Sequence, residues 1–343
     1  MKTKQLFERA SYLAQVRRLR ALAIEALKHY PFITHNIEFI KYSANAIFRI
    51  TDHQNKRYAL RINPYGHHQH AAIEEEIHWM QHIRSTTDLI VPAPVKTLSG
   101  HYFIEVQHQM VQSDRYCFVS EWLAGKTKWN GINEQYANTL GKLIGALHQS
   151  GRGISMPHRN YWLADGLIGA ETAKFYNIET LTDVSIQEQK VLTAARRMVY
   201  EILKEFECKH PEKTGVIHFD TQPNNILVHQ GHFAIIDFDD CGLGFYNDDL
   251  AVALCAFEHL AEGNLHQSFY RLKEALLRGY GEHMPLSAED IRLLPYFMLA
   301  RKLVTIAWLE ARKTNPGIGY YMPTAVERAI QFYQHILLHK VFK

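Results

Sequence analysis

The sequence predicts an α+β protein with a small N-terminal lobe, built on a mostly antiparallel sheet, and a larger C-terminal lobe that is mostly helical. Two observations carry this prediction. Runs of strand-forming residues gather within the first 120 residues, whereas helical periodicity dominates after position 125. The chain of 343 residues is also long enough for two lobes with separate cores. We therefore expect lobes at 1–120 and 126–343, joined by a hinge at 121–125.

The N-terminal lobe is expected to alternate helices with short strands. A leading helix of about Leu6–Lys28 carries regularly spaced leucines and ends before Pro31. Apolar residues at helical spacing, including Ile73, Ile77 and Met80, predict a second helix. The predicted elements after the leading helix are strands Ala46–Thr51 and Arg57–Ile62, helix Ala71–Arg84, and strands His101–Gln107 and Tyr116–Ser120.

The C-terminal lobe is expected to be helical apart from one island of strands. The island covers Gly215–Asp239 and contains a hairpin whose turn holds Gly231. An apolar helix, Leu250–Leu260, follows the island, and helices fill the remainder up to Lys343. The other predicted elements are helices Glu134–Gln149 and Ile186–His210, strand Val216–Phe219, and hairpin strands Ile226–His229 and Phe233–Ile236.

Composition restricts the function classes. The 38 basic and 35 acidic residues give a net charge of only +3, which argues against nucleic-acid binding as the main function. The four cysteines form no C-x-x-C pair, so neither a zinc knuckle nor a disulfide framework is expected, and free thiols suit a reducing cytoplasm. No apolar run is long enough to span a membrane, and the N-terminus lacks a signal-peptide core. We expect a cytoplasmic enzyme without a membrane or nucleic-acid partner; the sequence leaves its oligomeric state open.

Polar residues at the ends of the island's strands carry the chemistry. The segment contains the spacing His218-x-Asp220-x-x-x-x-Asn225, which has the form of a kinase catalytic loop. Asp237 follows after the hairpin, where kinases keep a metal-binding aspartate. Because Asn225 and Asp237 flank the open ends of the hairpin, we expect them to lie close together. Carboxylate and amide oxygens without thiols suit a hard cation such as Mg²⁺.

This segment resembles the aminoglycoside phosphotransferase and choline kinase superfamily, whose members are relatives of the protein kinases. Besides the His-x-Asp-x-x-x-x-Asn loop, that superfamily has an Ile-Asp-Phe/Trp motif and a later Asp-Leu-Ala motif. The chain has these motifs at Ile236–Phe238 and Asp249–Ala251, and the resemblance runs in order from about residue 37 to residue 251. It implies a protein-kinase-like two-lobe fold, with a nucleotide-binding N-terminal lobe and a catalytic, acceptor-binding C-terminal lobe.

The resemblance also implies roles in the N-terminal lobe. Arg61, on a strand where protein kinases carry a lysine, would bind the phosphates, and Glu76 on the next helix would be its partner. Arginine suits this place because its guanidinium group can hold phosphate in a two-pronged way. Strand alternation puts Ala59 on the same face as Arg61. The implied nucleotide-binding residues are Ser43 and Asn45 in a turn that lacks a glycine-rich pattern, Ala59, Arg61 and Glu76, and Glu121, Trp122 and Leu123 at the adenine hinge.

In the C-terminal lobe the resemblance implies a base and two metal ligands. Asp220 would orient the acceptor hydroxyl and take its proton, while Asn225 and Asp237 would hold Mg²⁺ on the triphosphate of ATP. Asn225 therefore counts with Asp220 among the catalytic residues. The structural alternatives are an Asx turn for Asp220 and strand-end capping for the other two.

Neighbouring polar residues are open to structural roles. His218 is expected to hold the loop through a backbone hydrogen bond, and Asp249 to cap the following helix and brace the loop. Asp239 and Asp240 could assist the metal or attract a cationic acceptor, with solvated or helix-capping positions as the alternative. His148, at the end of an amphipathic helix, is expected to be structural.

The expected activity is ATP- and Mg²⁺-dependent transfer of the γ-phosphate to a hydroxyl of a small molecule, such as an aminoglycoside, an amino alcohol or a homoserine-like metabolite. A bacterial protein serine/threonine kinase is one alternative, but the short segment between Asp237 and Asp249 leaves little room for a substrate-docking loop. A non-catalytic nucleotide-binding module is the other, and the presence of a base and metal ligands argues against it. We expect residues 151–177 and 286–316 to shape the acceptor pocket, where Glu258 and Glu262 could favour a cation.

Overall fold

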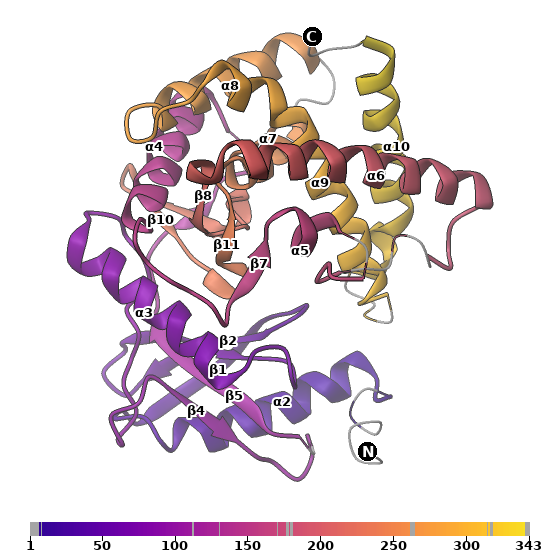
Figure 1. The fold of residues 1–343 in the computed structure, drawn as a ribbon. Helices are drawn as coiled ribbons and strands as arrows, with labels where there is room; N and C mark the ends of the chain where they lie inside the picture. The colour runs from indigo at the N-terminus through magenta and orange to yellow at the C-terminus, as the bar shows by residue number, and fades with distance from the viewer. Residues whose placement is uncertain are drawn as a thin grey trace. The chain divides into compact units, whose positions relative to one another are not determined.

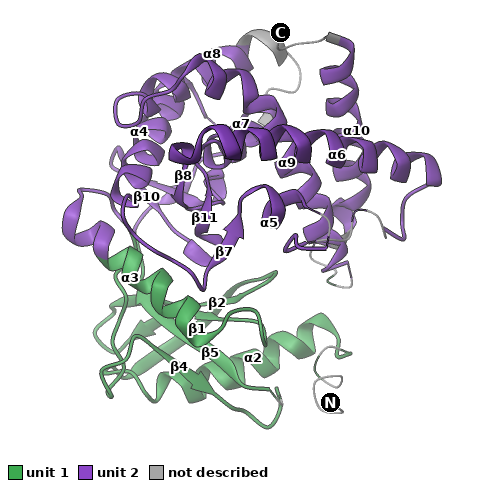
Figure 2. Ribbon diagram, in the orientation of Figure 1, with its two compact units in different colours: residues 1–81, 91–123, 315–317 green, residues 82–90, 124–314, 318–343 purple. Residues whose placement is uncertain are grey.

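The computed structural model describes residues 7, 9–111, 113–129, 131–169, 171–175, 178, 181–260, 265–313, 315 and 318–339 (Figure 1). The chain divides into two compact units (Figure 2). Unit 1 comprises Met1–Gln81, Val91–Leu123 and Asn315–Gly317, and unit 2 comprises His82–Ile90, Ala124–Thr314 and Ile318–Lys343. The expected α+β class is confirmed, since unit 1 contains a five-stranded sheet with helices and unit 2 is mainly helical.

An antiparallel sheet with the strand order β1-β2-β3-β5-β4 forms the centre of unit 1. Strands β2 (Ala46–Asp52) and β3 (Arg57–Ile62) match the predicted pair. Strands β4 (Phe103–Val106) and β5 (Arg115–Glu121) confirm two further predictions. The edge strand β1 (Thr34–Tyr42) is not among the predicted strands, because none of its residues is fully buried and its sequence shows no clear alternation.

Helix α2 (Tyr12–Leu27) packs on one face of this sheet and shares the core of unit 1 with it. The expected start of this helix near Leu6 is wrong: α2 begins at Tyr12, because the Ser11 hydroxyl accepts a hydrogen bond from the Ala14 amide and caps it there. Leu6 itself lies outside the described residues. The core residues shared by helix and sheet are buried and apolar, among them Leu19, Leu22, Phe48, Ile50 and Leu60.

The opposite face of the sheet carries charged residues. Leu60 of β3 belongs to the apolar core, so alternation turns Ala59 and Arg61 away from that core, as predicted. Helix α3 (His70–Thr86) follows β3 in the chain, and its Glu76 contacts Arg61. The sheet therefore separates an apolar side from a side that presents a charged pair.

Unit 2 contains two three-stranded sheets, with the orders β10-β9-β6 and β7-β11-β8. The hairpin of β9 and β10 is antiparallel, as predicted, whereas β11 pairs in parallel with β7 and antiparallel with β8. The sequence does not reveal β7, which has only three residues, or β11, in which two of the four residues are glycines rather than strand-forming residues. The strands are β6 (Lys126–Thr127), β7 (Asn160–Trp162), β8 (Thr214–Ile217), β9 (Ile226–His229), β10 (His232–Ile235) and β11 (Gly242–Phe245).

Seven helices are described in unit 2 besides the end of α3. They are α4 (Glu134–Ser150), α5 (Ala164–Ile168), α6 (Ile186–Lys209), α7 (Tyr246–Leu260), α8 (Leu265–Tyr280), α9 (Ala288–Glu310) and α10 (Met322–His339). Helices α4 and α6 lie where the periodicity predicts them, whereas α7 begins at Tyr246, four residues before its predicted start at Leu250. No helix in the described part of the chain is both long and apolar enough to cross a bilayer.

Helices α4 and α8 approach each other at two glycines. A Cβ on Gly141 would lie 2.0 Å from the carbonyl oxygen of Leu276, and a Cβ on Gly279 would lie 2.0 Å from that of Asn138. Because only a hydrogen atom fits at these positions, the two helix backbones pack in close contact. This packing holds one side of unit 2 together.

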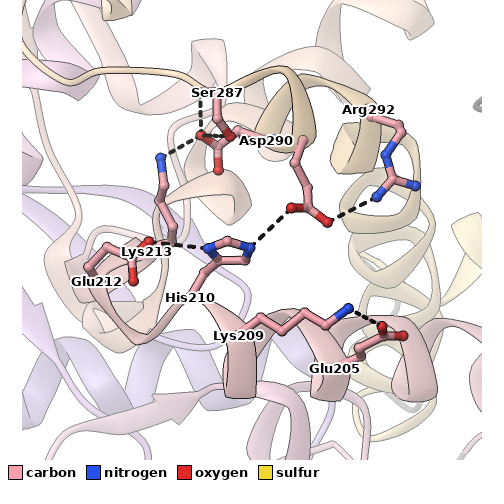
Figure 3. Close-up of polar contacts among 9 residues, drawn as sticks. Glu205, Lys209, His210, Glu212, Lys213, Ser287, Asp290 and Arg292 are labelled. Carbon is pink, nitrogen blue, oxygen red and sulfur yellow. Dashed lines mark hydrogen bonds and ion pairs between the residues drawn. The ribbon is translucent and has the colours of Figure 1, made fainter.

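A polar network joins the end of α6 to the start of α9 (Figure 3). The two ring nitrogens of His210 lie 3.2 Å from a Glu212 oxygen and 3.0 Å from a Glu289 oxygen. Lys213 Nζ donates to Asp290 at 2.6 Å, and Asp290 closes the capping box of α9 with Ser287. The network fixes the first turn of α9, the helix that supplies a residue to the candidate site.

Candidate active site

Helix α7 holds the loop that carries the candidate base. The Asp249 carboxylate accepts hydrogen bonds from the amides of His218 (2.9 Å) and Phe219 (2.6 Å). The Asp249 carbonyl accepts one from the Thr221 hydroxyl at 2.6 Å. These bonds draw the two amides out of the sheet, so β8 ends at Ile217 rather than at the predicted Phe219. Bracing of the loop by Asp249 is therefore confirmed.

Asp249 is a fully buried carboxylate in the first turn of α7. Its predicted capping role is wrong, because α7 begins at Tyr246. His148 lies 2.9 Å from the carboxylate through Nε2 and 3.0 Å from the Tyr280 hydroxyl through Nδ1. Burial is the largest single influence on the pKa of Asp249 and raises it, but the hydrogen bond and charge of His148, together with the contacts to His218, leave this pKa below its usual value of 3.8. The structural role expected for His148 is confirmed.

His218 is also fully buried, and it acts on the backbone of the loop. Burial lowers the pKa of His218 below 6.5, although the charges of Asp249 and Asp220 act in the opposite direction. The neutral imidazole accepts a hydrogen bond from the Asp220 amide at 3.3 Å through Nδ1. His218 is therefore a structural residue, as predicted.

Phe219 adopts a backbone conformation that is rare for an aromatic residue, with φ of +65°. The Trp162 ring stacks on the Phe219 ring at 3.9 Å with an angle of 9° between the planes. The guanidinium carbon of Arg301 lies 5.2 Å from the same ring. Packing and charge together hold a strained residue directly before Asp220.

The Asp220 carboxylate is held by three side chains. Its Oδ2 accepts from Asn225 Nδ2 at 2.6 Å, and Gln222 Nε2 lies 3.0 and 3.1 Å from its two oxygens. Arg301 Nη2 donates to Oδ1 at 2.8 Å. The Asp220 side chain is 16% exposed, so its orientation is fixed while it stays accessible to a small molecule. The alternative of a simple Asx turn does not account for these three partners.

Arg301 is a residue of the site that the sequence interpretation missed. It lies on α9, and its Nη1 also donates to the Phe219 carbonyl at 3.0 Å. Its separation of 81 residues from Asp220 hides the contact from any local motif. The only signal is an Arg301-Lys302 pair within a long apolar stretch, where a charge needs a partner.

Asn225 and Asp237 are placed at the open end of the hairpin. The Ile236 amide donates to the Asn225 carbonyl at 3.0 Å, which extends the pairing of β9 and β10 by one step. Asn225 Nδ2 donates to Asp220, so its Oδ1 is the atom that can bind a metal. An amide oxygen and a carboxylate form a donor set that fits Mg²⁺. Their role as metal ligands stays a prediction.

Asp239 and Asp240 lie in a short 3-10 helix (Phe238–Asp240) that is fixed through its carbonyl groups. Arg159 donates to the Phe238 carbonyl at 3.0 Å, and Trp162 Nε1 donates to the Asp240 carbonyl at 2.7 Å. Asp239 is buried and Asp240 is half-buried, so the solvated positions considered for them are wrong. Any role of theirs toward a metal or an acceptor stays a prediction.

Arg61 and Glu76 form a two-pronged ion pair in unit 1. Arg61 Nη1 lies 2.7 Å from Glu76 Oε1, and Nη2 lies 2.8 Å from Oε2. Both side chains are buried, and the Phe118 ring lies 5.2 Å from the guanidinium carbon. The predicted pairing is confirmed. Phosphate binding by this pair, and nucleotide contact by Ala59 on the same face, stay predictions.

Ser43 and Asn45 lie in the turn between β1 and β2. The Ser43 amide donates to the Asn45 carbonyl at 3.4 Å, and the Ser43 carbonyl accepts from Asn315 at 3.1 Å. Asn45 is buried, and its Oδ1 accepts from Asn63 at 3.3 Å. The turn is therefore closed without glycine, and its role over the phosphates stays a prediction.

Glu121, Trp122 and Leu123 follow at the end of β5. The amides of Glu121 and Trp122 donate to carbonyls within unit 1, those of Ala93 (2.8 Å) and Arg57 (3.1 Å). The backbone donors of Glu121 and Trp122 are therefore engaged within unit 1. The hinge role of all three residues stays a prediction.

Two acidic residues, Glu258 and Glu262, are expected to favour a cationic acceptor. Glu258 is paired with Lys302 at 2.5 Å, so its charge is already compensated. Glu262 lies outside the described residues, as do Asn177 and Pro316 at the ends of the two segments expected to shape the acceptor pocket.

Sequence comparison gives two matches. The sequence model of the phosphotransferase enzyme family matches residues 38–286. An uncharacterized protein of Deinococcus radiodurans is 31% identical over 104 residues, and the aligned part spans 30% of this chain and 30% of that relative.

Solved structures of the same fold include several kinases. A microcompartment-associated aminopropanol kinase has a TM-score of 0.81 at 23% identity, over 94% of this chain and 99% of that chain. An amicoumacin kinase in complex with AMP-PNP, Ca²⁺ and Ami has a TM-score of 0.74 at 17% identity, over 91% and 93%. A choline kinase from Cryptosporidium parvum has a TM-score of 0.64 at 14% identity, over 94% and 97%. These likenesses confirm the protein-kinase-like fold. Because the family match covers well over half of the chain, the chain belongs to the phosphotransferase enzyme family.

Proposed function

We propose that the protein transfers the γ-phosphate of ATP to a hydroxyl group of a small molecule in an Mg²⁺-dependent reaction. The observation that carries the proposal is the fixed orientation of Asp220 in a His-x-Asp-x-x-x-x-Asn loop whose hairpin ends at Asp237. Family membership supports phosphoryl transfer, and structural relatives named as kinases of aminopropanol and choline support a small hydroxyl acceptor.

Asp220 would accept a hydrogen bond from the acceptor hydroxyl and take its proton as the new O–P bond forms, while the bond from the γ-phosphorus to the bridging oxygen breaks and ADP leaves. Asn225 and Arg301 would keep the carboxylate pointed at that hydroxyl, which removes the entropy cost of finding the reactive orientation. Asn225 Oδ1 and Asp237 would hold Mg²⁺, which neutralises charge on the triphosphate when bound. In unit 1, Arg61 would grip phosphate oxygens from a position set by Glu76.

A small acceptor is favoured by the segment between Asp237 and Asp249. The 3-10 helix Phe238–Asp240, strand β11 and the start of α7 occupy this segment. A regular structure so short gives a protein substrate no docking loop, so we do not favour the protein kinase alternative. We place the reaction in the cytoplasm, which the free cysteines of the described chain support.

The test is acceptor-stimulated ADP formation by the purified full-length protein with ATP and Mg²⁺. We expect stimulation by a hydroxyl compound from a panel of amino alcohols, hydroxy acids, hydroxy amino acids, sugars and aminoglycosides. Asp220→Asn should lower that rate by about 10²- to 10⁴-fold, while nucleotide-induced thermal stabilisation persists. Asp237→Asn should abolish the Mg²⁺-dependent part of that stabilisation.

The control is Asp88→Asn, the same substitution at an exposed aspartate, which should behave like the wild type. An unchanged rate in Asp220→Asn would overturn the assignment of the base. Absence of both stabilisation by ATP with Mg²⁺ and ADP formation with every acceptor would overturn the proposed function as a whole.

A further inference from the structure

Two cations and three aromatic rings form a cluster in unit 2, which we call the basic–aromatic cluster. Lys174 Nζ lies 5.2 Å from the centre of the Trp162 ring and 5.6 Å from that of Phe175. The guanidinium carbon of Arg312 lies 5.4 Å from the centre of Phe175 and 4.5 Å from that of Trp308. Phe175 is thus shared by both cations. Ring faces attract the two positive charges and at the same time restrict the access of water.

The positive charge of the cluster is only partly compensated. Lys174 Nζ donates to the amide oxygen of Asn160 at 2.6 Å and lies 3.9 Å from the Asp240 carboxylate. Arg312 donates to the Trp308 carbonyl at 3.3 Å, and no carboxylate of the described chain lies within 4.0 Å of it. Burial lowers the pKa of both Lys174 and Arg312, although the charges of Asp240 and Asp239 act in the opposite direction. Arg312 thus lies among aromatic rings with no carboxylate of the described chain in contact, which leaves its guanidinium group able to pair with an anion.

The cluster lies beside the loop that carries the candidate base. The Trp162 ring, near which Lys174 lies, also stacks on the Phe219 ring at 3.9 Å. Phe219 directly precedes Asp220 in the chain. Lys174 and Arg312 also fall within the two segments that the sequence predicts to shape the acceptor pocket. Trp162 therefore connects the cluster by direct packing to the loop that carries Asp220.

We propose that the basic–aromatic cluster binds an anionic group of the acceptor, so that the substrate is a hydroxyl compound carrying a carboxylate or a phosphate. This inference rests on the proposed function and names its substrate class. Arg312 presents a planar fork that matches either anion, and Lys174 adds a point charge. A cationic acceptor is disfavoured, because Asp240 already faces Lys174 and Glu258 is paired with Lys302.

The experiment compares acceptors that differ only in the charge at one end. Homologous series of ω-hydroxy acids, ω-hydroxyalkyl phosphates and ω-amino alcohols are matched in chain length and tested for ADP formation with ATP and Mg²⁺. We expect members of an anionic series to stimulate ADP formation at least about tenfold more than their cationic counterparts, equivalent to about 1.4 kcal/mol. The anionic series that gives the higher rate of ADP formation identifies the anionic group as a carboxylate or a phosphate.

Substitutions at the cluster locate the effect. Arg312→Gln and Lys174→Met should each raise KM for the anionic acceptor about tenfold or more and leave KM for ATP unchanged. Arg292→Gln is the matched control, since it removes an exposed arginine at the other end of α9. Melting temperatures of all variants, and the stabilisation of each by AMP-PNP, show whether the fold and the nucleotide site are intact.

The outcomes separate this inference from the proposed function. ADP formation that is best with amino alcohols and unaffected by Arg312→Gln overturns the anionic subsite but leaves the kinase activity standing. If no series supports turnover, we measure whether the anionic compounds raise the melting temperature of the AMP-PNP complex. The inference is overturned if they do not raise it in the wild type. It is also overturned if they raise it equally in Arg312→Gln. Loss of all nucleotide effects would instead overturn the proposed function.

Discussion

Arg301 donates a hydrogen bond to the Asp220 carboxylate at 2.8 Å, and its other nitrogen donates to the carbonyl of Phe219 at 3.0 Å. One guanidinium group therefore fixes both the side chain of the candidate base and the backbone immediately before it. The guanidinium comes from α9, whose first turn is tied to the end of α6. A helix far from the catalytic loop in sequence thus determines the direction of its carboxylate.

Loss of this contact should impair catalysis more than binding. We expect Arg301→Ala to lower kcat about 10²-fold, because a base misplaced by about 1 Å costs that much, with KM for ATP unchanged. Added guanidinium ion should restore part of the activity of Arg301→Ala, which a purely structural defect would not allow. Steady-state kinetics with and without guanidinium chloride tests this; an equal loss in the control Arg292→Ala would contradict it.

The Arg61–Glu76 pair should be important for the stability of unit 1. Glu76→Gln leaves a buried guanidinium without its anion, so the free energy of unfolding should fall by about 3–5 kcal/mol. Replacing both residues, as Arg61→Met with Glu76→Leu, should recover much of this loss. Urea unfolding followed by tryptophan fluorescence, to which the buried Trp79 contributes, measures both changes in the free energy of unfolding. Glu74→Gln, at an exposed position of the same helix, should have little effect, and an equal loss there would refute the role of the pair.

Buried His218 predicts a dependence of stability on pH. Its pKa is lowered in the folded state, so below pH 6.5 the unfolded chain binds more protons than the folded one. The contribution of neutral His218 to the free energy of unfolding is therefore fully present above pH 6.5, and it is lost as the pH falls toward the folded-state pKa. In that pH range the free energy of unfolding of the wild type should fall by up to about 1.4 kcal/mol more per pH unit than that of His218→Gln. Urea unfolding of both proteins between pH 7.5 and about pH 5.5 tests this; parallel losses would contradict it.

The glycine contact between α4 and α8 predicts a destabilising alanine. Alanine normally favours a helix over glycine by about 1 kcal/mol. At Gly141, however, the added methyl group would lie 2.0 Å from the Leu276 carbonyl and must push the helices apart. We expect Gly141→Ala to lower the free energy of unfolding by about 1–3 kcal/mol. Thermal or urea unfolding gives the value, with Gln135→Ala on the exposed side of α4 as control.

The sequence predicted those features that depend on local pattern. The β9–β10 hairpin has strand-forming residues on both sides of a turn, and the short spacing of Asp220 and Asn225 places them in one loop, where they are hydrogen-bonded. Glu76 could be chosen among three neighbouring glutamates because helical spacing sets the inward face. In each case the residues that interact lie within one hairpin or one strand–helix unit.

The sequence did not predict features that depend on contacts between residues far apart in the chain. Arg301 reaches Asp220 across 81 residues, and nothing within α9 specifies that partner. The end of β8 was placed two residues too late, because the Asp249 carboxylate competes with the sheet for the amides of His218 and Phe219. Strand β1 lies at an edge and lacks the buried positions that make a strand visible in sequence.

Helix α9 contributes to both ends of the proposed acceptor site. Arg301 contacts the base, and Trp308, which contacts Arg312, follows seven residues later on nearly the same face. Seven residues correspond to two turns and a rise of about 10 Å, so the distance between Arg301 and Trp308 along the rigid helix is fixed. The enzyme would therefore discriminate among acceptors by length as well as by charge. A change of substrate length during evolution would then require residues to move along α9 by whole turns, while the catalytic loop itself could remain unaltered.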